Sequence, residues 1–475
     1  MGTQKTYEDI KKVLKEHRQS HLLALWDQLD TAQRQNLLAQ IGQLDLAKVD
    51  NWVANCVKNS ASVAISGDLV PASFYSYEPA DSQQHRKYAG AVELGRELIR
   101  QGKVAAFVVA GGQGTRLGFD GTKGNFPISP VKNKTLFQIF AESVAAASLK
   151  YQAICPWYIM TSPLNRAETE EIFRSNDYYG LDGKNVFIFQ QGTLPNFSTD
   201  GKILLADKDR LSYSPDGHGG SLKALYRSGA IEDMKRRGVE FISYFQVDNP
   251  LINIFDPLFI GLHALDKAEM SSKAVIKTNP YERVGSFCLV DGRLTVIEYS
   301  DLPDELAEKR NPDGSLAFKL GSIAIHIINR AFVERLNTDV FSLPLHKAVK
   351  KIPYIDEHGK LVEPAEPNGV KLESFVFDAV PLASKSIILQ ILRSGEFAPA
   401  KNAAGIDSVE TARRMIVARA AAWLESAGLI IPKKPDGSID CVLEIAPGFA
   451  LEKDDVKAKL NRIPQIKPGD RIYLS

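Results

Sequence analysis

The chain has 475 residues, of which 44% are hydrophobic and 24% are charged, and its formal net charge is +1. Because a single hydrophobic core stops growing at about 250–300 residues, this length predicts two or three domains. The nearly balanced charge excludes the basic surface that nucleic acid or an anionic membrane would need, so any binding of phosphate must be local.

Cysteine usage and the lack of targeting signals favour a cytoplasmic protein. Cys56, Cys155, Cys288 and Cys441 have neither metal-ligand spacing nor the density of a disulfide framework, and we expect them to be buried free thiols. The N-terminus lacks a positively charged region followed by an apolar stretch, and no uninterrupted apolar run approaches about 18 residues. We therefore expect no membrane partner and no nucleic-acid partner.

The N-terminal region, residues 1–100, is predicted to be helical and to carry no chemistry. Its apolar residues recur with helical periodicity as far as Cys56. Leu22, Leu23 and Trp26 form an apolar stripe, which either binds a partner or packs on the main domain.

A glycine-rich loop follows the first strongly apolar run of the chain. Val104 to Ala110 is predicted to be a buried strand of a parallel sheet, and it stops at Gly111-Gly112. A loop that also contains Gly114 and Gly118 can bring its backbone N–H groups close to an anion, because these residues have no Cβ atom to obstruct approach.

This loop fits neither of the two familiar phosphate-binding patterns. Gly112-Gln113-Gly114 is not followed by the third glycine of G-x-G-x-x-G, and the segment contains no G-x-x-x-x-G-K-[ST]. Instead it supplies its own cations, Arg116 and Lys123, which suits a polyphosphate whose charge must be neutralised while a bond to phosphorus breaks. The alternative is a tight turn with two solvated charges.

The residues after the loop alternate between predicted helices and strands. We expect helices at 135–147 and 166–176, and strands at 157–161 and 186–190. This alternation predicts an α/β fold with a doubly wound, mostly parallel sheet, in which ligand sites lie beyond the carboxyl ends of the strands.

Three strand ends or helix entrances then carry candidate site residues. Gln191 offers the donor and acceptor that reading a pyrimidine edge requires, or it is a surface amide. Gly217 and His218 lie in a glycine-rich helix entrance whose N–H groups can face a base or a phosphate, although a lone histidine is more often structural. Asp248 follows the apolar run 241–247 and is placed to hold Mg²⁺ against phosphate oxygens, or it caps a turn.

Further candidates lie in the second half of the chain. Glu298, in a strand-rich patch with Gly285, could accept hydrogen bonds from sugar hydroxyls. Lys371 precedes an aromatic stretch that we expect to continue as a strand to residue 378, and Lys401 lies in a loop. Taken alone, each lysine is more simply a solvated charge.

The end of the chain is predicted to be a small separate domain. It would hold a helix at 411–427 and strands at 441–451 and 471–474. The predicted division is therefore 1–100 for the N-terminal helical region, 101–400 for the core and 401–475 for this C-terminal domain.

At this point a family resemblance becomes specific. The string AGGQGTRLG at 110–118, followed by Lys123, resembles the signature loop of sugar-nucleotide pyrophosphorylases. Its continuation to KTLFQIFAE at 134–142 resembles the eukaryotic-type UDP-N-acetylhexosamine pyrophosphorylases. The resemblance runs from about residue 20 to 405 through ordered strings: PWYIMTS, FQQG, PDG with GG, VDN, TNP, EYS, KIPY, PNG and FVFD.

The resemblance implies a Rossmann-like nucleotidyltransferase that makes a UDP-sugar and pyrophosphate from UTP and a sugar 1-phosphate, most simply N-acetylglucosamine 1-phosphate, with Mg²⁺ as cofactor. It assigns the residues to four roles. Phosphate and catalytic contacts fall to Arg116, Lys123, Lys371 and Lys401; nucleotide contacts to Ala110, Gly111, Gly112, Gly114, Thr115, Gln191, Gly217 and Asp248; sugar contacts to His218, Gly285, Glu298, Tyr299 and Ser322; and metal contact to Asp248.

Two departures leave the identity of the sugar open. His218 and Ser322 stand where the resembling family usually has asparagine, and both positions lie near the sugar in that family. A UDP-glucose or broad UDP-sugar pyrophosphorylase therefore remains an alternative, as does a non-catalytic nucleotide-sugar-binding relative, although a pure binder would not need all the retained cations. The failed G-x-G-x-x-G spacing disfavours a dinucleotide-dependent oxidoreductase. Monomer and dimer both stay open.

Overall fold

The computed structural model describes residues 6–59, 67–338 and 343–475. Contacts within the chain group it into two compact units. Unit 1 combines residues 1–66, 192–220 and 342–378, and unit 2 combines residues 67–191, 221–341 and 379–475. The division predicted from the sequence, at 100 and 400, stays a prediction.

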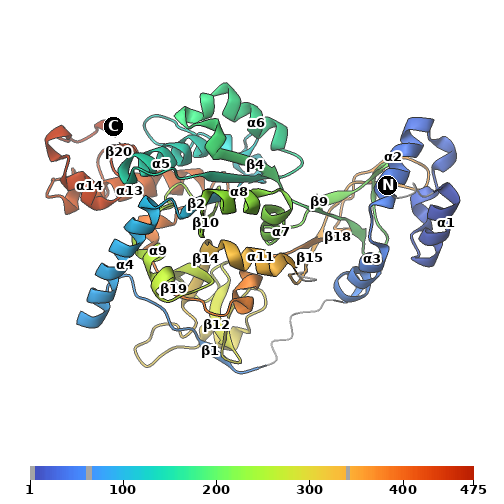
Figure 1. Cartoon of the computed structure of the whole chain (residues 1–475), viewed down its shortest axis with the longest axis horizontal. Coiled ribbons are helices and arrows are strands. Elements are labelled where there is room, and N and C mark those ends of the chain that lie inside the picture. The colour runs from blue at the N-terminus through green and yellow to red at the C-terminus, as the bar shows by residue number, and fades with distance from the viewer. Residues whose placement is uncertain (1–5, 60–66, 339–342) are drawn as a thin grey trace. The chain divides into compact units, whose positions relative to one another are not determined.

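Unit 2 is built on a mixed ten-stranded sheet with a parallel centre (Figure 1). Its parallel strands are, in spatial order, β10 (Phe241–Gln246), β2 (Val104–Val109), β3 (Trp157–Thr161) and β4 (Val186–Gln190). The antiparallel strand β14 (Leu320–Asn329) continues the sheet beyond β10. The expected doubly wound, mostly parallel sheet is confirmed for this centre.

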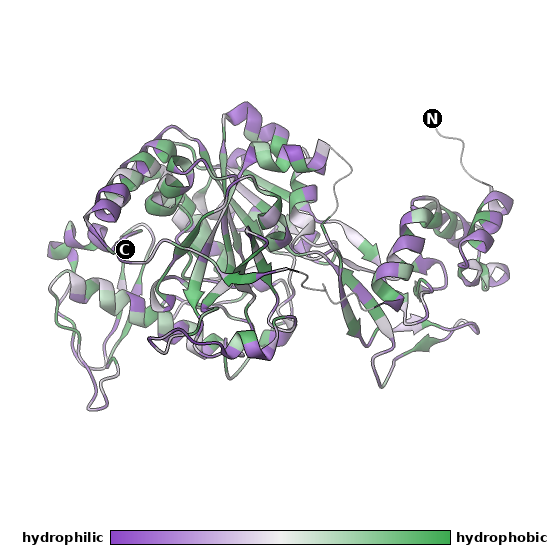
Figure 2. Ribbon diagram, turned by 90° about the horizontal axis from the view of Figure 1, so that it is seen from below, coloured by the Kyte–Doolittle hydropathy of each residue, from purple (hydrophilic) through white to green (hydrophobic). Residues whose placement is uncertain are grey.

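The central strands are buried on both faces because helices cover the sheet. Every residue of β2 and β3 is buried, which explains their continuous apolar runs, and Figure 2 shows the strands at the centre of the sheet as largely hydrophobic. Helices α4 (Ser82–Arg100) and α9 (Pro257–Leu265) pack closely side by side. Gly95 and Gly261 permit this approach, because a Cβ atom on either would lie within 2 Å of a carbonyl oxygen of the other helix.

The remaining elements of unit 2 complete the layers. Its other helices are α5 (Leu136–Tyr151), α6 (Arg166–Ser175), α7 (Gly220–Arg227), α8 (Ala230–Arg237), α10 (Asp304–Glu308), α11 (Arg330–Thr338), α12 (Arg393–Glu396), α13 (Val409–Ser426) and α14 (Lys453–Lys457). Its other strands are β1 (Leu69–Pro71), β11 (Met270–Ile276), β12 (Ser286–Val290), β13 (Arg293–Ile297), β19 (Ile388–Gln390), β20 (Val442–Ile445) and β21 (Arg471–Leu474). None of the described helices is long and apolar enough to cross a membrane.

Unit 1 joins the N-terminal helices to two later segments of the chain. Its helices are α1 (Tyr7–Glu16), α2 (Thr31–Gly42) and α3 (Leu46–Trp52), and its strands are β5 (Thr193–Pro195), β6 (Phe197–Ser198), β7 (Leu205–Asp207), β8 (Arg210–Leu211), β9 (Tyr213–Pro215), β15 (His346–Lys350), β16 (Tyr354–Ile355), β17 (Leu361–Val362) and β18 (Gly369–Glu373). Leu22 is buried in the shared core, and Leu23 and Trp26 pack partly buried against it. The apolar stripe is therefore a packing surface within unit 1.

Two of the expected strands end earlier than predicted. The strand at Lys371 ends at Glu373, because the carboxylate of Asp378 accepts a hydrogen bond from the backbone N–H of Phe375 (3.2 Å) and begins a 3-10 turn. The strand predicted at 441–451 ends at Ile445, where the chain turns through Pro447. All four cysteines are free, as expected, and Cys56 is only partly buried.

Candidate nucleotide and sugar sites

The glycine loop begins directly at the carboxyl end of β2. Two backbone hydrogen bonds fold it back on itself, from Gly114 N–H to the carbonyl of Gly121 (2.8 Å) and from Lys123 N–H to the carbonyl of Gly112 (3.1 Å). Gly118 takes a left-handed conformation with φ of +71°. Gly112, Thr115 and Arg116 are exposed, so a ligand can reach this side of the loop.

Asn165 anchors the loop from the start of α6. Its fully buried amide donates hydrogen bonds to the carbonyl of Ala110 and the hydroxyl of Thr122 (both 2.9 Å) and accepts one from the backbone N–H of Ser162 (2.8 Å). Glu168 accepts a further hydrogen bond from Thr122 N–H (3.0 Å). Asn165 was not predicted as a site residue, because no local pattern in the sequence indicates hydrogen bonds to such distant residues.

Gln191 lies against the loop, as expected for a residue at the end of β4. Its side-chain oxygen would stand 2.6 Å from a Cβ atom placed on Gly111, and its backbone N–H donates to the carbonyl of Thr161 (2.9 Å). The absence of a side chain at Gly111 therefore leaves room for the amide of Gln191. This contact brings two predicted nucleotide-binding residues together.

Three cations and one carboxylate converge beside the loop. Lys123 is buried, and burial lowers the pKa of its ammonium group. The negative charge of Asp248 opposes this lowering of the Lys123 pKa, while the positive charges of Arg116 and Lys401 add to it. Within the described chain, neither Lys123 nor Arg116 makes a side-chain salt bridge, so their charges are available to an anion.

Asp248 lies just beyond the end of β10. Its backbone carbonyl accepts a hydrogen bond from Ala400 N–H (2.9 Å), which ties the end of β10 to the segment that carries Lys401. Lys401 itself lies 3.6 Å from the carboxylate of Asp407. Thus four predicted site residues, separated by up to 285 positions in the sequence, meet in unit 2.

The carboxylate of Asp248 has the chemistry of a magnesium ligand. It makes no hydrogen bond or salt bridge to another described residue, which leaves its oxygens open to a cation. The described residues contain no group of three or more His, Cys, Asp or Glu side chains suited to a metal. This donor set suits Mg²⁺, which is commonly held by one or two carboxylates together with substrate phosphates.

A second group of predicted residues meets near β12 and β13. The backbone N–H of Ser322 donates to the carbonyl of Gly285 (2.7 Å). The Oε1 atom of Glu298 would lie 3.6 Å from a Cβ atom on Gly285, and Tyr299, next in the chain, is 46% exposed. Lys277, which the sequence analysis missed, donates from its ammonium group to the hydroxyl of Ser286 (3.2 Å) beside Gly285.

The other predicted residues, Gly217, His218 and Lys371, belong to unit 1. Gly217 has a φ of +81°, and a Cβ atom there would meet the carbonyl oxygen of Ser374 at 2.3 Å. Lys371 lies half-buried on β18. The glycine-rich turn therefore packs on the end of β18 within unit 1.

The surroundings of His218 determine which ring nitrogen carries the proton. Its ring stacks on Phe375, with 5.2 Å between ring centroids, and its Nδ1 atom accepts a hydrogen bond from the backbone N–H of Val376 (3.1 Å). In the neutral ring Nε2 must then carry the proton and act as a donor.

Comparison with known proteins identifies the family to which this chain and its fold belong. The UTP-glucose-1-phosphate uridylyltransferase family matches residues 75–475, and the chain belongs to this family of nucleotidyltransferases. The family makes UDP-sugars from UTP and a sugar 1-phosphate.

Curated relatives place the chain within one branch of the family. It is 38% identical to UDP-N-acetylglucosamine pyrophosphorylase of Saccharomyces cerevisiae over 443 residues, which cover 89% of this chain and 92% of the yeast protein. It is 36% identical over 469 residues to human UDP-N-acetylhexosamine pyrophosphorylase-like protein 1, covering 93% and 92% of the two chains.

A solved structure agrees with this placement. UDP-N-acetylglucosamine pyrophosphorylase of Trypanosoma brucei, solved with an inhibitor, is 25% identical and superposes with a TM-score of 0.82 over 100% of this chain and 99% of that chain. UDP-glucose pyrophosphorylase of Leishmania major, at 16% identity and a TM-score of 0.58, shares the fold.

Proposed function

We propose that this chain transfers the uridylyl group of UTP to N-acetylglucosamine 1-phosphate and releases pyrophosphate. The observation that carries the proposal is the convergence of Arg116, Lys123 and Lys401 with the carboxylate of Asp248 beside an exposed glycine loop. The names of the yeast and human relatives support an N-acetylated sugar.

In this proposal the chain aligns and neutralises its substrates, and it supplies no general base. A phosphate monoester has a second pKa of about 6, so the attacking oxygen of the sugar phosphate is already ionised near neutral pH. Gln191 binds the uracil, and Arg116 and the lysines hold the triphosphate so that attack occurs in line at the α-phosphorus.

Asp248 would hold Mg²⁺, which when bound would neutralise charge that develops on the phosphate oxygens. The sugar would lie on Glu298, Tyr299 and Gly285, with Ser322 near its acetamido group. A cytoplasmic location belongs to the same proposal and is consistent with the four free thiols.

The test is pyrophosphate release from UTP and Mg²⁺ with four 1-phosphates: N-acetylglucosamine, N-acetylgalactosamine, glucose and galactose. We expect a preference for N-acetylglucosamine 1-phosphate. Preference for glucose 1-phosphate or galactose 1-phosphate would change the proposed sugar substrate but leave the proposed uridylyl transfer in place. No release with any of the four would contradict the enzymatic assignment.

Variants of the charged cluster test the residues. Arg116→Ala and Asp248→Ala are each expected to lower kcat by about 10²-fold, the usual loss on removing one electrostatic stabiliser. Arg174→Ala is the matched control, because Arg174 is exposed on α6 and its one ion pair among the described residues is with neighbouring Glu171 (2.6 Å). An unchanged kcat in either cluster variant would contradict the proposed role of these residues in uridylyl transfer.

A further inference from the structure

A cavity of about 330 Å³ lies in unit 2, apart from the residues assigned to UTP and sugar. Four stretches form most of its wall: α5, residues 250–258, residues 389–396, and the C-terminal part of the chain from α13 to α14. Tyr77, Ser129 and Lys134 complete it. Its apolar walls include Ile252, Ile254, Ile391 and Trp423. This volume is at the lower end of small-molecule sites, so a compact organic ligand would fit.

Most of the charged groups in the cavity wall already have partners. Lys273 forms salt bridges with Asp256 (2.7 Å) and with Glu396. Glu444 accepts hydrogen bonds from two backbone N–H groups, and Lys134 pairs with Glu142 (2.6 Å). These groups stabilise the wall and have little capacity left for a ligand.

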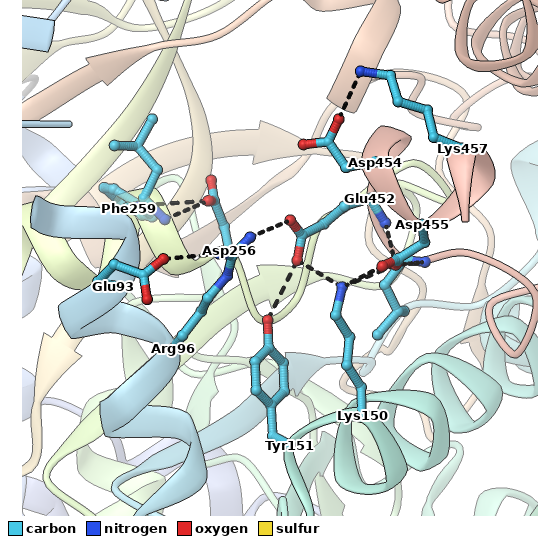
Figure 3. A network of polar contacts seen from close by, with 12 residues as sticks. Glu93, Arg96, Lys150, Tyr151, Asp256, Phe259, Glu452, Asp454, Asp455 and Lys457 are labelled. Atoms are coloured by element: carbon cyan, nitrogen blue, oxygen red, sulfur yellow. Dashed lines mark hydrogen bonds and ion pairs between the residues drawn. The ribbon is translucent and has the colours of Figure 1, made fainter. Parts of the chain in front are cut away.

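Figure 3 shows the same pattern at one edge of the cavity. The carboxylate of Glu452 lies among Arg96, Lys150 and Tyr151, and its oxygens are 3.6 Å from the guanidinium of Arg96 and 2.9 Å from the ammonium of Lys150. Lys150 also binds Asp455 (2.7 Å). This network joins the C-terminal part of the chain to α4 and α5.

Arg419 differs from these groups. Its guanidinium donates to the carbonyl of Leu251 (2.8 Å) and lies 5.0 Å from the ring of Trp423, but it has no carboxylate within 4 Å among the described residues. Burial lowers its pKa to about 10, and the more distant charge of Glu396 opposes that lowering only in part. A guanidinium carries five N–H donors, so several remain for a carboxylate in the cavity.

We propose that this cavity binds a small organic monocarboxylate, with its carboxylate on Arg419 and its apolar body against Ile252, Ile391 and Trp423. The carboxylates of Asp256, Glu396 and Glu452 in the same wall would repel a doubly charged phosphate, whereas one negative charge matches one guanidinium.

The cavity is connected to the proposed active site through its own wall. Residues 250–254 begin two positions after Asp248, and Glu396 precedes Lys401 by five positions. Asn249 joins the two segments, since its side chain donates to the carbonyl of Glu396 (2.8 Å) and accepts from Ala398 N–H (3.0 Å). A ligand in the cavity therefore acts on the backbone that positions Asp248 and Lys401, and this part of the inference rests on the proposed function.

Calorimetric titration of the full chain tests the site without any assay of activity. The probes are 3-phenylpropionate, indole-3-acetate and benzoate, with 3-phenylpropan-1-ol as the uncharged control. We expect at least one acid to bind with a Kd below about 1 mM and about tenfold more tightly than the alcohol. No binding by any acid up to about 10 mM, or equal binding of the alcohol, overturns the site.

Three variants locate the binding. Arg419→Met should weaken the acid about tenfold, whereas Arg414→Met, which changes an exposed arginine on the same helix, should not. Gly395→Leu should abolish binding by filling the cavity, because only one atom, Cβ of Leu392 at 3.9 Å, lies near a Cβ atom placed on Gly395. Unchanged affinity in both Arg419→Met and Gly395→Leu places the probe elsewhere and contradicts the proposal.

Kinetics then test the coupling. A saturating acid should change KM for UTP or kcat by about fivefold in the wild type and leave Gly395→Leu unaffected. If the acid binds but both constants stay the same, the site stands and the coupling is wrong. If the chain releases no pyrophosphate at all, the proposed function fails, while the titrations still decide the site.

Discussion

Lys123 carries a charge that the folded chain does not neutralise. Burial, together with the positive charges of Arg116 and Lys401, lowers its pKa below the usual 10.5. At neutral pH the charged form therefore destabilises the ligand-free fold, and this cost disappears only as the pH rises from the folded pKa towards 10.5.

We predict that Lys123→Met lowers the activity of the protein and at the same time raises its stability. The melting temperature of the ligand-free chain should rise by about 2 °C, and kcat should fall by about 10²-fold. Differential scanning fluorimetry and pyrophosphate release measure the two effects. Lys184→Met, which removes an exposed lysine in the same unit, should change neither; a lower melting temperature for Lys123→Met would contradict the interpretation.

Gly111 offers a second test, because its role depends on another side chain. A methyl group there would lie 2.6 Å from the amide oxygen of Gln191 and must displace it. Gly111→Ala should raise KM for UTP about tenfold, the equivalent of one lost hydrogen bond of about 1.4 kcal/mol. Gln191→Ala should have a similar effect and the double variant little more; additive losses would show that the two residues act separately.

At the scale of elements, His263 links α9 to β11 and β14. Its fully buried ring lies 2.7 Å from the hydroxyl of Ser271 and 2.8 Å from the amide oxygen of Asn329. Burial lowers its pKa to about 4, although the hydrogen bond with Asn329 opposes this. The folded chain therefore holds the neutral ring.

This burial predicts a loss of stability in mild acid. Below about pH 6.5 the unfolded chain binds a proton that the folded chain does not, so the free energy of unfolding falls between about pH 6.5 and 4, by about 3 kcal/mol from this group. His263→Gln should lose less over the same interval. Urea unfolding at a series of pH values measures the difference, and parallel curves for the two proteins would refute it.

Helices and strands were predicted from the sequence more accurately than the segments against which they pack. The strands at 157–161 and 186–190 have the expected bounds, because buried parallel strands leave continuous apolar runs. The apolar stripe of the N-terminal helices was expected either to bind a partner or to pack on the main domain. It shares a core with β6, β8 and β18, which lie within the predicted range 101–400 but could not be named from the sequence. Pairing across hundreds of residues leaves no periodic signal in the chain.

The same limit applies to the site. Lys123, Asp248 and Lys401 were identified from strand ends and family resemblance, and the structure brings them together. Asn165 was missed, because its importance lies in two buried hydrogen bonds to a distant segment, at Ala110 and Thr122. Such a network depends on the folded arrangement and leaves no local pattern.

At the scale of the molecule, two units with separate cores predict two unfolding transitions. Leu14 is fully buried in unit 1 and Leu262 is fully buried in unit 2. Leu14→Ala and Leu262→Ala should each destabilise one unit by about 2–5 kcal/mol. Scanning calorimetry should then show each variant lowering a different transition, with the larger enthalpy in unit 2.

Surface variants provide the control for this experiment. Lys184→Met in unit 2 and Lys12→Ala in unit 1 replace exposed residues and should leave both transitions in place. A single transition that both leucine variants lower equally would mean that the two units unfold as one.

The interrupted course of unit 1 also matters while the chain is being made. Its N-terminal helices leave the ribosome first, but their core partner β18 ends at residue 373, more than 300 residues after α3. At a translation rate of about 5–20 residues per second, the apolar faces of α1 and α2 remain without β18 for tens of seconds. Unit 1 thus completes its core late in synthesis, and until then the apolar faces of its first helices lack their partner strand.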